Sequence, residues 1–219
     1  MKPILFNTEM VRAILEGRKT VTRRVIKPQP WDSVFCDGHE FMPDDYGGCK
    51  PTGFICRKCG LGVCPPHCKY PVGEALFRPY CWPDDILYVR ETWAKSMAGT
   101  YMYKATDDPI IIDRWHPSIH MPKEAARLFL RVTDVRVERL QDITPEQARA
   151  EGCDGRCNCP SSGAPGSLSC VEMDFSIEKF ESVWDSTIKP ADLPLYGWYA
   201  NPWIWVIEFE RCEKPEGDR

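Results

Sequence analysis

A long segment rich in cysteine, proline and glycine interrupts the chain between residues 30 and 83, and it limits what the remainder can fold into. It shows no helical or strand period, so it offers no ordinary apolar core of its own. The 219 residues suffice for one domain with a sizeable core plus such an insertion. We therefore expect a single domain over residues 1–219, with residues 30–83 as an insertion.

The insertion carries a pattern of cysteines that is typical of a metal site. Cys56 and Cys59 form a CxxC pair, and Cys64 and Cys68 follow closely. Two thiolates on one tight turn fit a tetrahedral zinc ion, and thiols in the cytosol stay reduced. We predict a structural zinc ion bound by Cys56 and Cys59. Its other two ligands remain open among Cys64, Cys68, Cys36, His39, Cys49, His67 and Cys81.

A second cysteine-rich loop spans residues 153–170. It holds Cys153, Cys157, Cys159 and Cys170 among glycine, serine and proline. The spacing is less regular than a CxxC pair, but four thiols in eighteen residues still favour zinc over free structural cysteines. One or two closed, structural zinc sites are therefore expected.

Regular structure is expected on both sides of the insertion. Thr8 is placed to cap a first helix that ends at Gly17, and Thr144-Pro145-Glu146-Gln147 opens a second that ends at Gly152. A third helix carries an apolar stripe within 177–184. Strands are expected at 86–89, 101–105, 128–137 and 203–209. Strands that do not alternate with helices indicate an α+β fold with a curled antiparallel or mixed sheet.

Charge is concentrated near the start of the chain. Residues 1–30 contain seven Lys or Arg and two Glu, a net charge of +5, which leaves −9 for the rest of a chain with a net charge of −4. A local basic face on an acidic protein favours a compact anionic ligand over a long duplex. No run of eighteen apolar residues suggests a membrane span, and the first residues do not resemble a signal peptide, so a cytoplasmic location is expected.

The basic residues include a short signature, Gly17-Arg18-Lys19-Thr20-Val21-Thr22-Arg23-Arg24, which fits the pattern Gly-x-Lys-x-x-Thr-x-Arg. An ammonium, a hydroxyl and a guanidinium near a helix end can receive an oxyanion or a base edge. The signature resembles that of the ASCH-domain family. Three later blocks are similar to phage and prophage members: Pro83 to Trp93, Trp115 to Pro122 and Trp205 to Phe209.

The resemblance implies a curled β-barrel of the PUA-like kind with a few flanking helices and a cleft. It also implies a ligand that is RNA, single-stranded nucleic acid or a modified nucleoside. One branch of the family consists of amidohydrolases that deacetylate acetylcytidine with a Lys and a Thr of the signature and a Glu of a later helix. The matching residues here are Lys19, Thr22 and Glu151.

Amide hydrolysis would assign a role to each of these three residues. Thr22 would be the nucleophile, and a desolvated Lys19 with a pKa lowered by Arg23 or Arg24 would be its base. Glu151 would carry the proton to the departing amine. Each also has a plainer interpretation: Lys19 as a solvated lysine or a phosphate contact, Thr22 as a strand threonine, and Glu151 as a residue at the end of a helix that faces water.

Further ligand contacts are expected from outside this trio. Arg23 and Arg24 belong to the signature, and Glu91 and Trp93 share one face of an expected strand, with Arg90 on the other. A carboxylate can accept from a base amine and an indole can stack on a base. Ser118 and His120 lie in a loop bounded by prolines that would border the same cleft.

Three functions remain open at this point. The chain is a nucleic-acid or nucleoside binding protein, an amidohydrolase acting on acetylcytidine or a similar modified base, or a protein-interaction module whose zinc-bound loops contact a partner.

Overall fold

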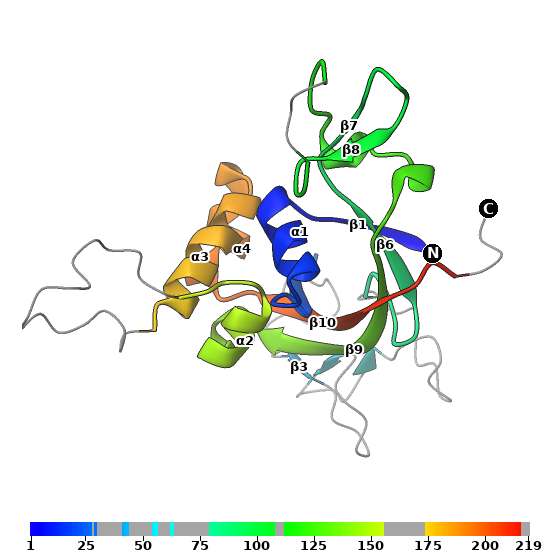
Figure 1. The fold of residues 1–219 in the computed structure, drawn as a ribbon. Coiled ribbons are helices and arrows are strands. Elements are labelled where there is room, and N and C mark those ends of the chain that lie inside the picture. The colour runs from blue at the N-terminus through cyan, green and yellow to red at the C-terminus, as the bar shows by residue number, and fades with distance from the viewer. Residues whose placement is uncertain are drawn as a thin grey trace, which may run out of the picture.

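The computed structural model describes residues 1–27, 29, 79–107, 112–155 and 174–215, and the backbone of three short strands at 41–43, 54–56 and 62–63. A five-stranded sheet forms its centre (Figure 1). The order is β1 (Lys2–Leu5), β6 (Ile86–Arg90), β9 (Phe129–Arg139), β10 (Trp203–Cys212) and β2 (Val21–Val25). Only the β1–β6 pair of this sheet is parallel. The predicted α+β class with a mixed sheet is confirmed.

The four α-helices of the described residues gather beside this sheet (Figure 1). They are α1 (Thr8–Leu15), α2 (Pro145–Ala150), α3 (Ser176–Thr187) and α4 (Leu193–Tyr196). Short 3₁₀ turns are found at Ser118–His120, Lys123–Ala125, Leu140–Asp142, Pro190–Asp192 and Trp198–Ala200. The predicted capping box at Thr144 is confirmed, since its hydroxyl accepts from Gln147 N and the Gln147 side chain accepts from Thr144 N. The predicted cap of α1 is wrong by one residue: Asn7 accepts from Met10 N at 2.8 Å.

Two smaller sheets accompany the central one. The hairpin of β7 (Trp93–Lys95) and β8 (Tyr101–Tyr103) stands apart from it (Figure 1). The other comprises β3 (Phe41–Pro43), β4 (Phe54–Cys56) and β5 (Gly62–Val63). These three strands lie in the segment expected to lack regular structure. Strands of two or three residues are too short to show a period, so the sequence pattern could not reveal them.

Two apolar clusters pack on the sheet. The larger joins Val89, Leu130, Val135 and Ile207 to Ile14 of α1. The smaller unites Val21, Ile204 and Val206 with Phe180 and Trp184 of α3. Alternate residues of β10 therefore serve different clusters, which explains why its 203–207 stretch is continuously apolar.

The strands at the two ends of the central sheet approach each other at one point. Arg24 of β2 donates from Nη2 to the carbonyl oxygen of Leu5 at the end of β1, at 3.0 Å. The sheet is therefore curled, although the strand pairs of the described residues do not close into a barrel. Within the described part of the chain, no helix is long and apolar enough to cross a membrane.

Cys81 gives a first prediction, because it is fully buried in the larger cluster. Burial raises the pKa of its thiol from 9.0 to about 12. At pH 8 the thiolate fraction then falls roughly a thousandfold. We expect Cys81 to resist iodoacetamide in the native protein and to react in urea, as measured by peptide mass spectrometry. Equal alkylation rates in both states would contradict this placement.

Candidate functional site

The signature begins at a sharp turn after α1. Gly17 has φ = +75°, a left-handed conformation that glycine adopts without strain. The turn lets the N–H groups of Arg18 and Lys19 both donate to the carbonyl oxygen of Ala13, at 2.8 and 3.0 Å. Lys19 thus enters the protein interior just before β2 starts at Val21.

The end of α2 meets this turn from the other side. Thr20 N donates to the carbonyl oxygen of Ala150 at 2.9 Å, and Lys19 and Glu151 form an isolated antiparallel bridge. Gly152 has φ = +90°, and a Cβ atom there would lie 2.9 Å from that of Ala13. Only glycine lets the two segments approach this closely, so Gly152 fixes the position of Glu151.

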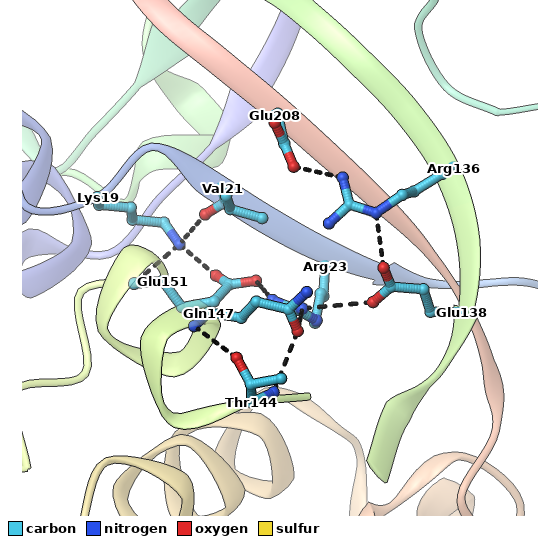
Figure 2. A network of polar contacts seen from close by, with 9 residues as sticks. All are labelled: Lys19, Val21, Arg23, Arg136, Glu138, Thr144, Gln147, Glu151 and Glu208. Carbon is cyan, nitrogen blue, oxygen red and sulfur yellow. Dashed lines mark hydrogen bonds and ion pairs between the residues drawn. The ribbon is translucent and has the colours of Figure 1, made fainter. Parts of the chain in front are cut away.

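Lys19 and Glu151 form a buried ion pair. Lys19 Nζ donates to Glu151 Oε2 at 2.5 Å, to the Val21 carbonyl oxygen at 2.7 Å and to the Glu151 carbonyl oxygen at 3.0 Å (Figure 2). Three acceptors match the three protons of an ammonium group. Burial lowers the pKa of Lys19, Glu151 opposes that shift, and nearby Arg24 adds to it. The pKa of Lys19 is therefore lowered on balance, although three acceptors surround its amine.

Arg23 approaches the same carboxylate from β2. Its Nη1 lies 3.2 Å from Glu151 Oε1, and its Nη2 donates to Gln147 Oε1 at 3.0 Å. Its Nε is buried and has no hydrogen-bond partner among the described residues. Glu151 thus lies between two cations, each bound to a different oxygen.

A chain of charges continues across the sheet from Arg23 (Figure 2). Arg23 lies 3.5 Å from Glu138 of β9, and Glu138 accepts from Arg136 at 2.6 Å. Arg136 also contacts Asp134 and Glu208. Burial lowers the pKa of Arg136, but the hydrogen bonds that it donates to Glu138, Glu208 and Asp134 outweigh burial and raise it. The guanidinium of Arg23 is therefore held by Glu151 and Gln147 on one side and by Glu138 on the other.

A cavity of about 430 Å³ opens beside this pair. Its polar side contains Thr22, Arg23, Arg24 and Glu151. Its apolar side is formed by Met10 and Ala13 of α1 and by Phe180, Val183 and Trp184 of α3. Small-molecule pockets have volumes of roughly 300–1,000 Å³ with mostly apolar walls and a few convergent polar groups. The volume of this cavity falls in that range, but ten of its seventeen lining residues are polar or charged, including Glu9, Arg18, Asp154 and Lys179.

The structure thus brings together part of the set expected from the sequence. Thr22, Arg23, Arg24 and Glu151 line the cavity, and Lys19 lies behind Glu151 in their wall. Both Lys19 and Thr22 are buried. Burial lowers the pKa of Arg24, as it does that of Lys19.

The other expected ligand contacts lie outside this cavity. Glu91 is 1% exposed and binds Arg127 through both oxygens, at 2.8 and 2.9 Å. Arg90 donates to the carbonyl oxygen of Met121 at 2.9 Å. Trp93 lies on the β7–β8 hairpin, and Ser118 and His120 form a 3₁₀ turn. None of these residues lines the cavity described here.

Most of the expected zinc ligands fall outside the described residues. Cys56 is known as a backbone position at the end of β4, whereas Cys59, Cys64, Cys68, Cys157, Cys159 and Cys170 lie outside. Cys153 is buried in the smaller apolar cluster and borders the cavity, and burial raises the pKa of its thiol. The expected zinc ligation by Cys153 stays a prediction, because the other three cysteines of its loop lie outside the described residues. No group of three possible ligands occurs in the described part of the chain.

Sequence reasoning missed two parts of the site. Phe180 and Trp184 belong to the apolar stripe expected within 177–184. They pack in the smaller apolar cluster and also line the cavity, which the stripe did not indicate. Gln147 was recognised only as a capping residue, yet its side-chain oxygen also accepts from Arg23. No local pattern could show this second contact, which joins residues 124 positions apart.

Comparisons with family models, curated proteins and solved structures give no match to this chain.

Proposed function

We propose that this chain is an ASCH-type protein with a PUA-like curled barrel, and that its cavity binds a modified nucleoside. The observation that carries the proposal is the meeting of Thr22 and Glu151 at the polar side of a cavity walled by Phe180 and Trp184. The two polar residues are far apart in sequence and come from the two segments that the family signature and its later helix supply. The curl indicated by the Arg24–Leu5 contact supports the barrel.

The cavity suits a nucleoside better than a polymer. A carboxylate held between two cations stays an acceptor, as a base amine requires. The Thr22 hydroxyl can donate or accept, and the aromatic side chains supply apolar contact. The volume of about 430 Å³ accommodates one nucleoside rather than several nucleotides.

Calorimetric titration with a panel of free and N-acylated nucleosides tests this proposal. Thr22→Val removes one hydroxyl while keeping the shape, and we expect it to weaken binding about three- to tenfold. Thr20→Val is the matched control, because Thr20 is exposed on the same segment and does not line this cavity. Failure of every nucleoside to bind, or equal losses in both variants, would reject the proposal.

The buried Lys19–Glu151 pair favours hydrolysis of an N-acylated base as a second candidate function. Transfer of one proton from Lys19 to Glu151 would leave a neutral amine and a carboxylic acid. The amine would take the proton of Thr22 as its oxygen adds to the acyl carbon, and Glu151 would protonate the leaving base amine as the C–N bond breaks. Water would then cleave the Thr22 ester to release the carboxylic acid.

Chromatography of acetylcytidine incubated with the protein tests this second function. Lys19→Arg keeps a cation but provides no base at neutral pH. Release of cytidine by the native protein, lost in Lys19→Arg with nucleoside binding retained, is the expected result for an enzyme. Binding without any turnover in the native protein would restrict the function to binding.

A further inference from the structure

Glu138, near the end of β9, lies one contact away from the cavity without lining it. Its Oε2 lies 3.5 Å from Nη2 of Arg23, which does line the cavity (Figure 2). Only 20% of the Glu138 side chain and 1% of the Arg23 side chain are exposed, so solvent and salt screen this attraction weakly. The charge of Glu138 therefore acts on a residue of the cavity wall from behind.

Arg23 divides its guanidinium between two carboxylates. Its Nη1 lies 3.2 Å from Glu151 Oε1, whereas Lys19 Nζ lies 2.5 Å from Glu151 Oε2. A charge-assisted N–H···O bond is ordinarily about 2.7–2.9 Å long, so the contact between Arg23 and Glu151 is loose. Glu138 attracts Arg23 from the other side. Oε1 is therefore the less strongly held oxygen of Glu151.

The charges of these side chains explain why Arg23 is shared. Glu151 contacts two cations, Lys19 and Arg23, so the three groups sum to +1 when the lysine is protonated. Glu138 supplies the matching negative charge. Without Glu138, Glu151 would be the sole counterion of the buried Arg23 among the described ion pairs. An uncompensated buried charge is costly, so the guanidinium would then move onto Glu151 Oε1.

Glu138 is itself held in place from outside the cavity. Arg136 Nε donates to Glu138 Oε1 at 2.6 Å, and Arg136 also contacts Asp134 and Glu208. The other oxygen, Glu138 Oε2, is buried and has no hydrogen-bond partner among the described residues. Since Arg136 occupies Oε1, Oε2 is left to face Arg23.

We propose that Glu138 is a positioning residue for the cavity: it draws Arg23 away from Glu151, so that Glu151 Oε1 is free to accept a hydrogen bond from an amine of the ligand. The inference rests on the proposed function, because it names the oxygen that receives the base amine. Gln147 assists, since its Oε1 accepts from Arg23 Nη2 at 3.0 Å. A base with a carbonyl in place of the amine would set two acceptors against each other and gain nothing from Oε1.

Calorimetric titration with cytidine and uridine tests this proposal, because cytidine carries an amine donor where uridine carries a carbonyl acceptor. Glu138→Gln keeps the size of the side chain and removes its charge. We expect it to weaken cytidine binding about three- to tenfold, the loss of one hydrogen bond, and to leave uridine binding within about twofold. A merely structural role would weaken the binding of both nucleosides alike, and that result would overturn the proposal.

Crystal structures of the native protein and of Glu138→Gln give a second readout that needs no ligand. The distance between Arg23 Nη1 and Glu151 Oε1 should be shorter in the variant than in the native protein. An unchanged or longer distance would show that Glu138 does not draw Arg23 away, and the proposal would be rejected.

Glu210→Gln is the matched control, because Glu210 of β10 is a carboxylate that lies 3.8 Å from Arg131 and is 62% exposed. It should change neither cytidine binding nor the distance between Arg23 and Glu151, and a loss as large as that in Glu138→Gln would contradict the proposal. Glu138→Asp covers the case in which Glu138→Gln does not fold. It keeps the charge but withdraws the carboxylate from Arg23 by one methylene, so a smaller loss confined to cytidine is expected, and no such loss would overturn the proposal.

This proposal and the proposed function fail in different ways. If the native protein binds no nucleoside, the function of the cavity is rejected, and the crystal distance still decides whether Glu138 draws Arg23 away from Glu151. If the native protein and Glu138→Gln bind cytidine equally well, the role of Glu138 is rejected alone.

Discussion

Replacing Glu151 by glutamine is expected to lower the free energy of unfolding by about 3–5 kcal/mol, whatever the ligand of the cavity proves to be. The carboxylate is the counterion of Lys19 at 2.5 Å and of Arg23 at 3.2 Å. Lys19 is fully buried, so water cannot replace the lost charge. Breaking one partner of a buried pair leaves the other as an uncompensated charge, which costs more than the pair itself contributes.

A double-mutant cycle separates this charge effect from lost packing. Lys19→Met alone should also destabilise, because it leaves Glu151 with Arg23 only. The double variant Lys19→Met with Glu151→Gln should lose clearly less than the sum of the two single changes, since no unpaired lysine remains. Urea unfolding monitored by circular dichroism measures all three variants.

Glu146→Gln is the control for this cycle, because Glu146 belongs to the same helix and its side chain is exposed to solvent. It should change stability little. Additive losses in the double variant would show that Lys19 and Glu151 do not interact as described.

The sequence could predict two kinds of element: strands with a long run of patterned apolar residues, and helix ends whose capping residues are neighbours in the chain. β9 and β10 show ten or more residues of apolar pattern, and the Thr144 capping box depends on four consecutive residues. The contact between Lys19 and Glu151 could not be predicted from the hydrophobic periodicity of the sequence. It was expected only through the resemblance, and the structure shows how Gly17 and Gly152 permit it.

The rest depends on contacts between distant residues. Glu91 and Trp93 were expected to act together on a ligand because they alternate along one strand. Instead the strand breaks between them: β6 ends at Arg90 and β7 starts at Trp93. Arg127, two residues before β9 begins, holds Glu91. Trp93 then belongs to a separate hairpin. An alternation rule holds only while the strand continues, and nothing local signals this interruption.

We expect the second large effect from the loss of zinc, which should destabilise the insertion at residues 30–83. Cys56 ends β4, where it lies opposite Phe41, the first residue of β3. Cys59 follows Cys56 by three residues and His39 precedes Phe41 by two, so the sequence supplies possible ligands on both sides of this end of the strand pair. Three strands of two or three residues cannot hold a fold through their own pairing. A structural zinc ion contributes on the order of 10–16 kcal/mol in small zinc-binding units.

We therefore expect protein purified without added metal to contain at least one zinc ion per chain by elemental analysis. Cys56→Ser should remove one equivalent and raise amide hydrogen exchange throughout residues 36–81, because the thiolate ligand is lost. Exchange in β9 and β10 should stay slow, since Cys81 is the one residue of that segment that belongs to their apolar clusters in the described part of the chain. Cys212→Ser is the matched control, as Cys212 is a partly exposed free cysteine at the end of β10. Less than half an equivalent of zinc under reducing conditions, or equal zinc loss in both variants, would reject the site at Cys56.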